Sequence, residues 1–285
     1  MIRKARALVG YIPRDNALQV IQGGVIQPGS DQSSALQVWE QARSKVAARP
    51  VVQFADPTLE LPAAYAQRAA EFMQRPDVQQ NFAPHDWSVI ALDLSVPILT
   101  YQTLVHSEDA VQRVSAVDIA DPDAVFDACL PQSEKVELPG GFDPSQNAFT
   151  ISSLNPNLRI ASFEVVETPV LQGLTKRIVG FSMSLGSSHI QITEYRGRWM
   201  IRDGYHRLFG LMARGAKMVP CVLIRARSFE ETGAGRRGFF GFELLYSDRP
   251  PLLSDFHDDN YSVEVTTPAV RKVVRIRAEE FVVPV

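Results

Sequence analysis

The stretch WMIRDGYHRLFGLMARGAKMVPCVLI, residues 199–224, carries the most specific structural signal in this sequence. Its first residues are typical of a strand, and Asp203-Gly204 is a turn signal. Four apolar residues then recur on one face of a helix: Tyr205, Leu208, Phe209 and Met212. Gly215 stands where the glycine that ends a helix is expected, and residues 219–224 read as a buried strand. The stretch therefore predicts a strand, a glycine turn, a helix and a second strand in succession.

The segments on either side differ in their periodicity. Residues 158–166, 178–185 and 190–193 alternate as strands do, and Arg196-Gly197 reads as a hairpin turn before residue 199. Before residue 131 the pattern is mainly helical, with helices expected near residues 36–46, 61–75, 109–117 and after Asp121-Pro122. We therefore predict an α+β protein. A mainly helical N-terminal region, residues 1–147, precedes a core of mixed sheet and short helices, residues 148–285, with residues 131–147 as the linker.

Composition places the chain among globular proteins. It has 285 residues, of which 45% are apolar, enough for a full core in one or two domains. Its apolar runs are far shorter than the ~18–20 residues that cross a bilayer, and Pro13 and Arg14 interrupt the first of them before a signal peptide forms. Two cysteines, Cys129 and Cys221, give neither a zinc pattern nor a disulfide framework. We expect a soluble cytoplasmic protein with no membrane partner, and the oligomeric state is not indicated.

Charge is distributed unevenly although the net charge is only -3. Residues 196–237 hold nine arginines and one lysine against three carboxylates, whereas residues 101–144 hold nine carboxylates against two cations. A small net charge argues against binding nucleic acid by bulk charge. The basic segment nevertheless is a candidate for contact with phosphate groups.

The turn at residues 203–207 is the candidate site. If Asp203 caps the helix, His206 and Arg207 lie in its first turn, where a cation costs about 0.3–1 kcal/mol unless an anion is bound. A phosphate there would accept hydrogen bonds from free amides, from the Arg207 fork and from His206, and Gly204 would let the backbone approach it. The alternative is that Arg207 pairs with a carboxylate and Asp203 only caps the helix.

Residues 199–224 resemble the central motif of the ParB/sulfiredoxin superfamily. In that motif a strand ends in a glycine followed by His-Arg or Arg-Arg, a short helix, a glycine and a Val-Pro strand. The resemblance implies a ParB/sulfiredoxin-like core and assigns nucleotide phosphates to Gly204, Tyr205, His206 and Arg207. Asp203 matches relatives that read Asp-Gly-His-His-Arg, among them free-serine kinases, which implies catalytic roles for Asp203 and His206 and Mg²⁺ with a nucleoside triphosphate as cofactor.

This sequence departs from two branches of the superfamily. Tyr205 stands where sulfiredoxin has its catalytic cysteine, so sulfinic-acid reduction is not expected. The Glu-Asn-x-x-Arg motif of chromosome-partition proteins and a helix-turn-helix are both missing from the sequence, so a centromere-binding clamp is not expected either. The resemblance does not extend to the first 150 residues.

Two loops could add contacts to a bound phosphate. Ser187 and Ser188 precede the hairpin that leads into the motif and could form an anion nest, although an ordinary polar loop is the simpler interpretation. Arg236 and Arg237, in a glycine-rich loop, could close over phosphates or contact DNA, but a solvated loop is again simpler. Residues 256–259 (Phe-His-Asp-Asp) favour a solvated turn over a metal site, so no protein metal centre is expected.

Three hypotheses follow for function. The first is a nucleotide- or phosphate-binding protein, with nucleotide hydrolysis or phosphotransfer as the reaction if it is an enzyme. The second is a non-enzymatic DNA-associated ParB-like protein whose basic segment lies along the phosphate backbone. The third is a scaffold in which the motif persists only as folding geometry.

Overall fold

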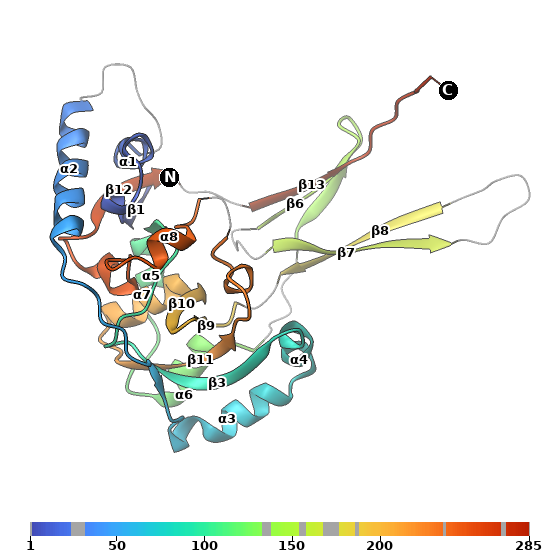
Figure 1. Ribbon diagram of the computed structural model, residues 1–285. Coiled ribbons are helices and arrows are strands. Elements are labelled where there is room, and N and C mark those ends of the chain that lie inside the picture. The colour runs from blue at the N-terminus through green and yellow to red at the C-terminus, as the bar shows by residue number, and fades with distance from the viewer. Residues whose placement is uncertain are drawn as a thin grey trace, which may run out of the picture. The chain divides into compact units, whose positions relative to one another are not determined.

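The structure is a computed structural model that describes residues 2–23, 32–132, 138–153, 158–167, 177–185, 188–235, 238–268 and 272–284. It has an α+β fold (Figure 1), as predicted. The chain divides into two compact units. Unit 1 comprises Met1–Pro131 and Ser188–Ala269, and unit 2 comprises Gln132–Ser187 and Val270–Val285.

Unit 1 is built around a five-stranded mixed sheet of order β10-β9-β11-β3-β2. Its strands are β2 (Thr58–Leu59), β3 (Asp86–Asp93), β9 (Gln191–Tyr195), β10 (Arg198–Asp203) and β11 (Met218–Arg225). β9 and β11 are parallel, and the other pairs are antiparallel. A second sheet, β12-β1-β4, consists of β1 (Ile2–Ala7), β4 (Leu104–Val105) and β12 (Val263–Pro268).

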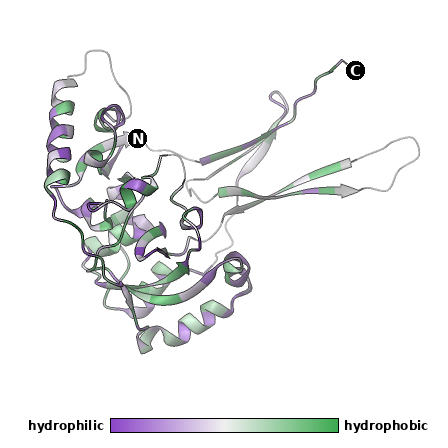
Figure 2. Ribbon diagram, viewed as in Figure 1, coloured by the Kyte–Doolittle hydropathy of each residue, from purple (hydrophilic) through white to green (hydrophobic). Residues whose placement is uncertain are grey.

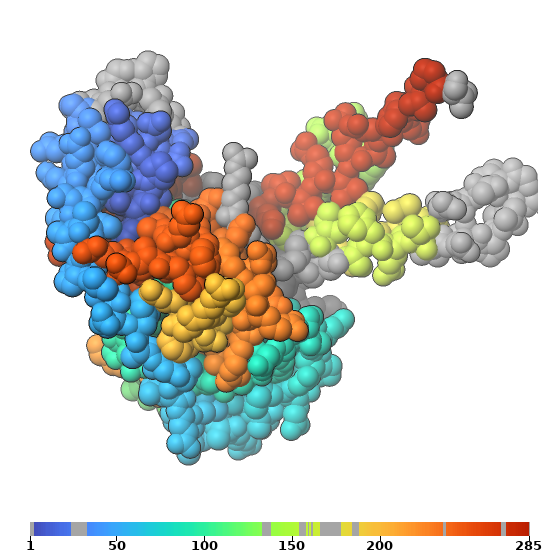
Figure 3. Space-filling model, viewed as in Figure 1, coloured from blue at the N-terminus to red at the C-terminus, as the bar shows by residue number. Residues whose placement is uncertain are grey.

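The helices of unit 1 cover these sheets and supply most of the remaining core. They are α1 (Arg14–Ile21), α2 (Gln32–Ala48), α3 (Ala63–Gln74), α4 (Pro76–Phe82), α5 (Ser107–Arg113), α6 (Pro122–Cys129), α7 (Tyr205–Ala213) and α8 (Phe242–Leu245), with 3-10 helices at Val9–Tyr11, Glu230–Thr232 and Leu253–His257. α6 packs on β11, α3 packs on α6, and α5 packs on both α7 and β1. Side chains of α2, α8 and the β9–β10 hairpin form a continuous surface on one face (Figure 3). Among the described residues, no helix is both long enough and apolar enough to cross a membrane.

The stretch at 199–224 folds as its pattern predicts. β9 and β10 form a hairpin whose turn residues, Arg196 and Gly197, both have positive φ. α7 buries Leu208 and Phe209, and Gly215 follows it with φ of 90°. β11 is buried along nearly its whole length, as expected of a strand flanked by β9 and β3.

Unit 2 contains strands only, among the residues that the structure describes. β5 (Gly140–Asp143), β6 (Ala148–Ser153) and β13 (Lys272–Arg277) form an antiparallel sheet of order β13-β6-β5. β7 (Leu158–Glu167) and β8 (Arg177–Leu185) form an antiparallel pair in which Phe163 lies opposite Phe181. The alternating patterns at 158–166 and 178–185 therefore do correspond to strands.

The two units differ from the expected division at residues 147 and 148. β3 belongs to the region predicted to be mainly helical, yet it pairs with β11 from Asp86–Arg225 to Asp93–Met218. β1, which was not predicted as a strand, pairs with β12. Such partners lie more than a hundred residues apart in the sequence, so local periodicity carries no signal of their pairing.

Candidate functional site

The candidate site begins where β10 passes into α7. Gly204 adopts a left-handed conformation, with φ of 84°, and is the N-cap residue of the helix. A Cβ atom at this position would lie 2.8 Å from the Ile190 side chain, so the close packing against Ile190 itself requires glycine. The expected role of Gly204, opening the backbone to a ligand, is therefore not needed to explain this residue.

Asp203 does not cap α7 in the way the sequence suggests. Its Oδ1 accepts a hydrogen bond from the amide of the next residue, Gly204, at 2.7 Å. The first intrahelical bond is donated by the Leu208 amide to the Gly204 carbonyl at 3.0 Å. The N-cap residue is a glycine and provides no side-chain cap, so the amides of Tyr205, His206 and Arg207 are candidate donors to a ligand.

Arg207 is bound to the protein itself, which corrects the expectation that it faces a phosphate. Its Nη1 donates to the carbonyl of Ala128 at 2.8 Å and to that of Cys129 at 3.4 Å. Its Nη2 donates to the carbonyl of Ser188 and to the Ser188 Oγ, the latter at 2.6 Å. Burial lowers the pKa of the guanidinium. Arg207 thus joins the C-terminus of α6 to the segment that enters β9.

His206 points to a different segment. Its Nε2 accepts a hydrogen bond from the backbone amide of His106 at 3.2 Å, and the two imidazole rings are parallel with centroids 5.7 Å apart. Burial, followed by the charge of Arg113, lowers the pKa of His206 to about 3. The ring is therefore neutral near pH 7, and Nε2 is an acceptor. The expectation that His206 and Arg207 converge as donors on one anion is not met.

Tyr205 keeps a hydroxyl that can act as a donor. Its ring packs on His206, with centroids 4.2 Å apart. Burial, with a smaller contribution from Asp203, raises the pKa of the phenol to about 12. The hydroxyl therefore stays protonated across the physiological range.

A cation that the sequence did not reveal lies beside this turn. α5 and α7 run in parallel: His106 contacts His206, a Cβ at Gly210 would collide with the Ala110 carbonyl, and Arg214 donates to the carbonyls of Ser115 and Val117. Arg113, in the last turn of α5, is exposed. Its charge lowers the pKa values of Tyr205, His206 and Arg207, so the guanidinium is near all three residues of the first turn.

Arg113 differs from most arginines of this unit because no described residue forms a hydrogen bond or ion pair with it. Its neighbour on the same helix, Asp109, already pairs with Arg3. The sequence could have indicated a basic residue at the end of a helix at 109–117, but nothing local could have placed it beside residue 205.

The predicted loop contacts are only partly described. Ser187, Arg236 and Arg237 lie outside the described residues. Ser188 is described, and its hydroxyl and carbonyl both bind Arg207. It therefore supports the Arg207 contact with α6 and is not aimed at the amides of α7.

Most described cations of the basic segment are used within the protein. The guanidinium carbon of Arg198 lies 3.9 Å from the centroid of the Phe54 ring. Arg225 Nη1 lies 3.7 Å from Asp86 Oδ1, and Arg227 Nη2 lies 2.8 Å from Glu231 Oε1. Arg214 binds the two carbonyls that follow α5. The partners belong to separate segments of the chain, so each of these described arginines already has a contact of its own within unit 1.

The residues of the site can hold a metal ion only together with a ligand. No three His, Cys, Asp or Glu residues group together in the described ranges, and this includes His257 and the two aspartates after it. Mg²⁺ is commonly held by one or two carboxylates plus phosphate oxygens and water. A single carboxylate such as Asp203 can complete the coordination of a Mg²⁺ ion that is bound to a nucleotide. It is too few ligands to hold a metal ion without the nucleotide.

Comparisons with known proteins leave the site to be judged on its geometry. No protein-family model matches the chain, and neither the curated proteins nor the solved structures provide a match.

Proposed function

We propose that this protein binds a phosphate-containing ligand at the first turn of α7. The observation that carries the proposal is the combination of the amides of Tyr205, His206 and Arg207, which the N-cap glycine leaves without a side-chain cap, with the exposed cation of Arg113, which pairs with no described residue. Free amides at a helix N-terminus favour an anion, and a nearby guanidinium adds a charge-assisted contact. The resemblance of residues 199–224 to the ParB/sulfiredoxin motif supports the same location.

The residue roles in this proposal differ from those implied by the resemblance. Arg113 replaces Arg207 as the cation, the backbone amides provide most of the hydrogen bonds, and the Tyr205 hydroxyl is a further donor. Arg207 and His206 hold the turn in place through α6 and α5. Asp203 would help bind Mg²⁺ when a nucleotide supplies the other oxygens, as in other magnesium–nucleotide sites.

A nucleotide is the preferred class of ligand because Asp203 lies directly beside the amides. A carboxylate so close would repel a bare phosphate, whereas a Mg²⁺-bound phosphate chain neutralises it. We therefore expect Mg²⁺ to strengthen nucleotide binding. The proposal concerns binding, and phosphate release is measured alongside it to detect hydrolysis.

The test is a titration of the full chain with ATP, CTP, GTP and inorganic phosphate, each with and without Mg²⁺. Tryptophan fluorescence can follow thermal unfolding of unit 1, because Trp39, Trp87 and Trp199 all belong to it. A ligand at 100 times its dissociation constant should add about 2.7 kcal/mol of stability. No shift with any of the four ligands contradicts the proposal.

Matched arginine variants locate the site. Arg113→Ala removes an exposed cation with no described partner, so it should leave the fold intact and weaken binding roughly tenfold, the value of a charge-assisted hydrogen bond. Arg14→Ala removes an exposed arginine from α1 and is the control for the loss of one positive charge. Equal binding by the two variants would place the ligand elsewhere.

A separate binding measurement with duplex DNA tests the alternative of a DNA-associated protein. Backbone binding requires affinity that falls steeply with salt, with a slope near -0.9 per phosphate neutralised. The dispersed arginines of residues 196–227 do not favour such a surface. Salt-sensitive DNA binding that Arg113→Ala leaves unchanged would support the alternative over the nucleotide site.

A further inference from the structure

Unit 2 buries very little apolar surface of its own. The described chain exposes sixteen large apolar side chains, and eleven of them lie in unit 2, which contains about a quarter of the residues. By contrast, the buried apolar residues in the described part of unit 2 are Ala148, Ile151 and Leu158, and the continuous core cluster includes none of them. Its strands are paired through the backbone but lack a core.

The exposed residues of the β7–β8 pair form a stripe on one face. Phe163 lies opposite Phe181, and Val165 lies opposite Val179. Since directly opposed residues of an antiparallel pair point to the same side, and every second residue shares that side, all four form one face. All four are exposed: Phe163 by 66%, Phe181 by 39%, Val165 by 59% and Val179 by 53%. We call this set the hairpin stripe; apolar segments of β7 and β8 are visible in Figure 2.

The opposite face of the same pair begins as a polar surface. Ser162 and Ser182 lie opposite each other and share a hydrogen bond of 2.5 Å, and Glu164 lies opposite Gly180. The next pair on this face is Val166 with Ile178, and Ile178 is exposed, so the face is polar at Ser162, Ser182 and Glu164 and apolar beyond them. All four side chains of the hairpin stripe are exposed, so no described residue of unit 2 covers the apolar side.

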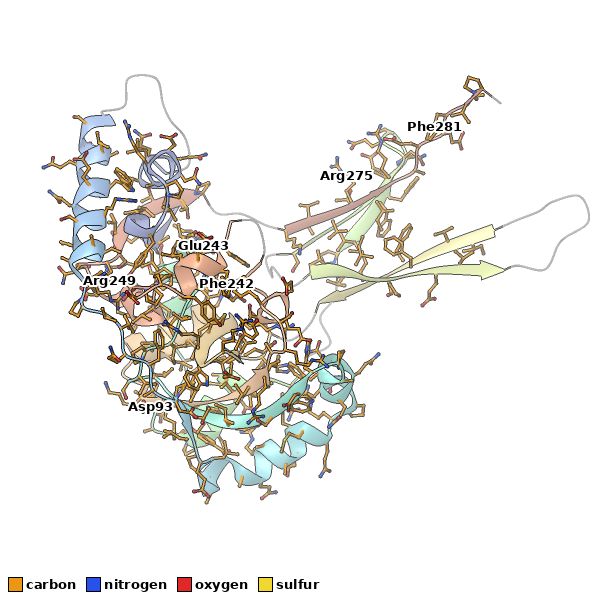
Figure 4. The ribbon with its side chains drawn as sticks, in the orientation of Figure 1. Asp93, Phe242, Glu243, Arg249, Arg275 and Phe281 are labelled. Atoms are coloured by element: carbon orange, nitrogen blue, oxygen red, sulfur yellow. The ribbon has the colours of Figure 1, made fainter. Side chains whose placement is uncertain are left out.

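The β5–β6–β13 sheet repeats this feature. Phe142 lies opposite Phe149, which lies opposite Ile276, and the two phenylalanines are exposed. In the chain segment after β13, Phe281 is also exposed (Figure 4). The four residues of the hairpin stripe alone present roughly 400 Å² of apolar surface per copy. A contact between two stripes then buries roughly 800 Å², which is in the range of weak, transient interfaces.

The charges of unit 2 are compatible with contact between identical copies. The unit contains eight Lys and Arg residues and seven Asp and Glu residues, so two copies do not repel each other strongly. The hairpin stripe itself contains no charged residue that would select an oppositely charged partner. The four residues of the hairpin stripe carry no charge that would repel the same stripe of a second copy, so a symmetric contact is electrostatically allowed.

We propose that unit 2 is a homodimerisation module, in which the hairpin stripe of one copy packs on the hairpin stripe of a second copy. A two-stranded sheet is only marginally stable in water, and a second sheet placed on its apolar face provides the missing core. The small area predicts a dissociation constant in the micromolar range rather than a permanent dimer.

The test is sedimentation velocity of the full chain from low to high micromolar concentration. The wild-type protein should change from monomer to dimer across this range. The variant Val165→Ser/Val179→Ser should raise the dimer dissociation constant at least tenfold. Tryptophan fluorescence should show unchanged unfolding of unit 1, because both valines are exposed and lie in unit 2.

The matched control replaces the same number of exposed valines in unit 1. Val51→Ser/Val111→Ser removes side chains of 47% and 41% exposure and should leave dimerisation unchanged. A wild-type chain that is monomeric at every concentration overturns the proposal. So does an oligomer that both double variants weaken equally, or that neither weakens. Phe163→Ser alone is the milder variant if the double substitution disturbs the hairpin.

Discussion

Unit 1 and unit 2 are both built from hydrogen-bonded elements, but they differ in what those elements bury. In unit 1 one continuous cluster joins buried side chains from β1, α3, β3, α7 and β11. In unit 2 the backbone ladders are equally regular, yet phenylalanines and valines on them are exposed. The comparison teaches that strand pairing alone does not make an autonomous fold, because apolar burial supplies most of the stability.

The arginines of the two units also differ in how far they are buried against other groups of the protein. In unit 1, Arg49 forms a buried two-point ion pair with Asp255, at 2.7 and 2.9 Å, and Arg207 binds backbone carbonyls. In unit 2, Arg275 projects from β13 (Figure 4), and both Arg275 and Arg277 are exposed. Unit 1 uses arginines as internal connectors, so Arg113, which pairs with none of the described residues, is informative.

The largest effect should come from the core of unit 1. Phe82 is fully buried, with its ring 5.2 Å from that of Trp87 and 6.1 Å from that of His189. Phe82→Ala leaves a cavity and should cost about 3–5 kcal/mol of unfolding free energy. Urea unfolding followed by tryptophan fluorescence measures it. A loss below about 1 kcal/mol would mean that unit 1 is no better packed than unit 2.

Arg207→Ala should have the next largest effect. The sequence alone suggests that this change weakens phosphate binding and leaves stability nearly intact, whereas the contacts predict the reverse. Removing the guanidinium leaves the carbonyls of Ala128 and Ser188 without their donor, at a cost of about 2–4 kcal/mol.

Urea unfolding compares this variant with Arg227→Ala, whose exposed ion pair with Glu231 is screened by solvent and should contribute much less to stability. A stable Arg207→Ala protein that has lost ligand binding would restore the original assignment of Arg207 to phosphate.

Local signals in the sequence predicted much of unit 1 and the β7–β8 pair of unit 2, whereas β5 lies in the segment predicted to be a linker. The turn at Arg196-Gly197, the helix face through Leu208, and the cap of α6 by Asp121, whose side chain accepts from the Asp123 amide, all depend on neighbouring residues. The assembly could not be predicted in the same way. The pairing of β3 with β11 and of β1 with β12 depends on contacts between distant segments, which periodicity does not encode.

The same limit applies to the candidate site. The position of the turn at Gly204 followed from the motif, but the targets of its side chains did not. Arg207 and His206 are adjacent in sequence, and whether they share a ligand depends on α6 and α5, which approach from other parts of the chain. Arg113 was missed because its relation to α7 arises only from the close contact of Ala110 with Gly210.

Acid should weaken unit 1 through His206. Its pKa is lowered to about 3 in the folded protein, mainly by burial and also by Arg113 and the neighbouring His106, while Asp109 acts in the opposite direction. The ordinary pKa is about 6.5, so below that pH the unfolded chain takes up a proton that the folded chain does not. Stability is therefore complete above about pH 6.5 and declines as the pH falls toward 3.

His206→Gln should reduce that decline. Glutamine keeps an acceptor for the His106 amide but does not titrate. Between about pH 7 and about pH 5, the wild-type protein should lose about 1–2 kcal/mol more than the variant. Urea unfolding at both pH values measures the difference, and it cancels the contribution of His189, whose burial lowers its pKa to about 4 and which both proteins share. Equal pH dependence would show that His206 is accessible to protons in the folded state.

The smallest effect should come from unit 2, and it completes the comparison with Phe82. Phe163→Ala removes the same atoms as Phe82→Ala, but the Phe163 side chain is exposed in one copy of the chain. At protein concentrations where the chain is monomeric, the variant should change the unfolding free energy by no more than about 0.5 kcal/mol. At higher concentrations the two proteins should separate, because only the wild-type stripe gains burial from a second copy. A cost of several kcal/mol in the monomer would show that Phe163 already packs against its own chain, and the contrast between the two units would then disappear.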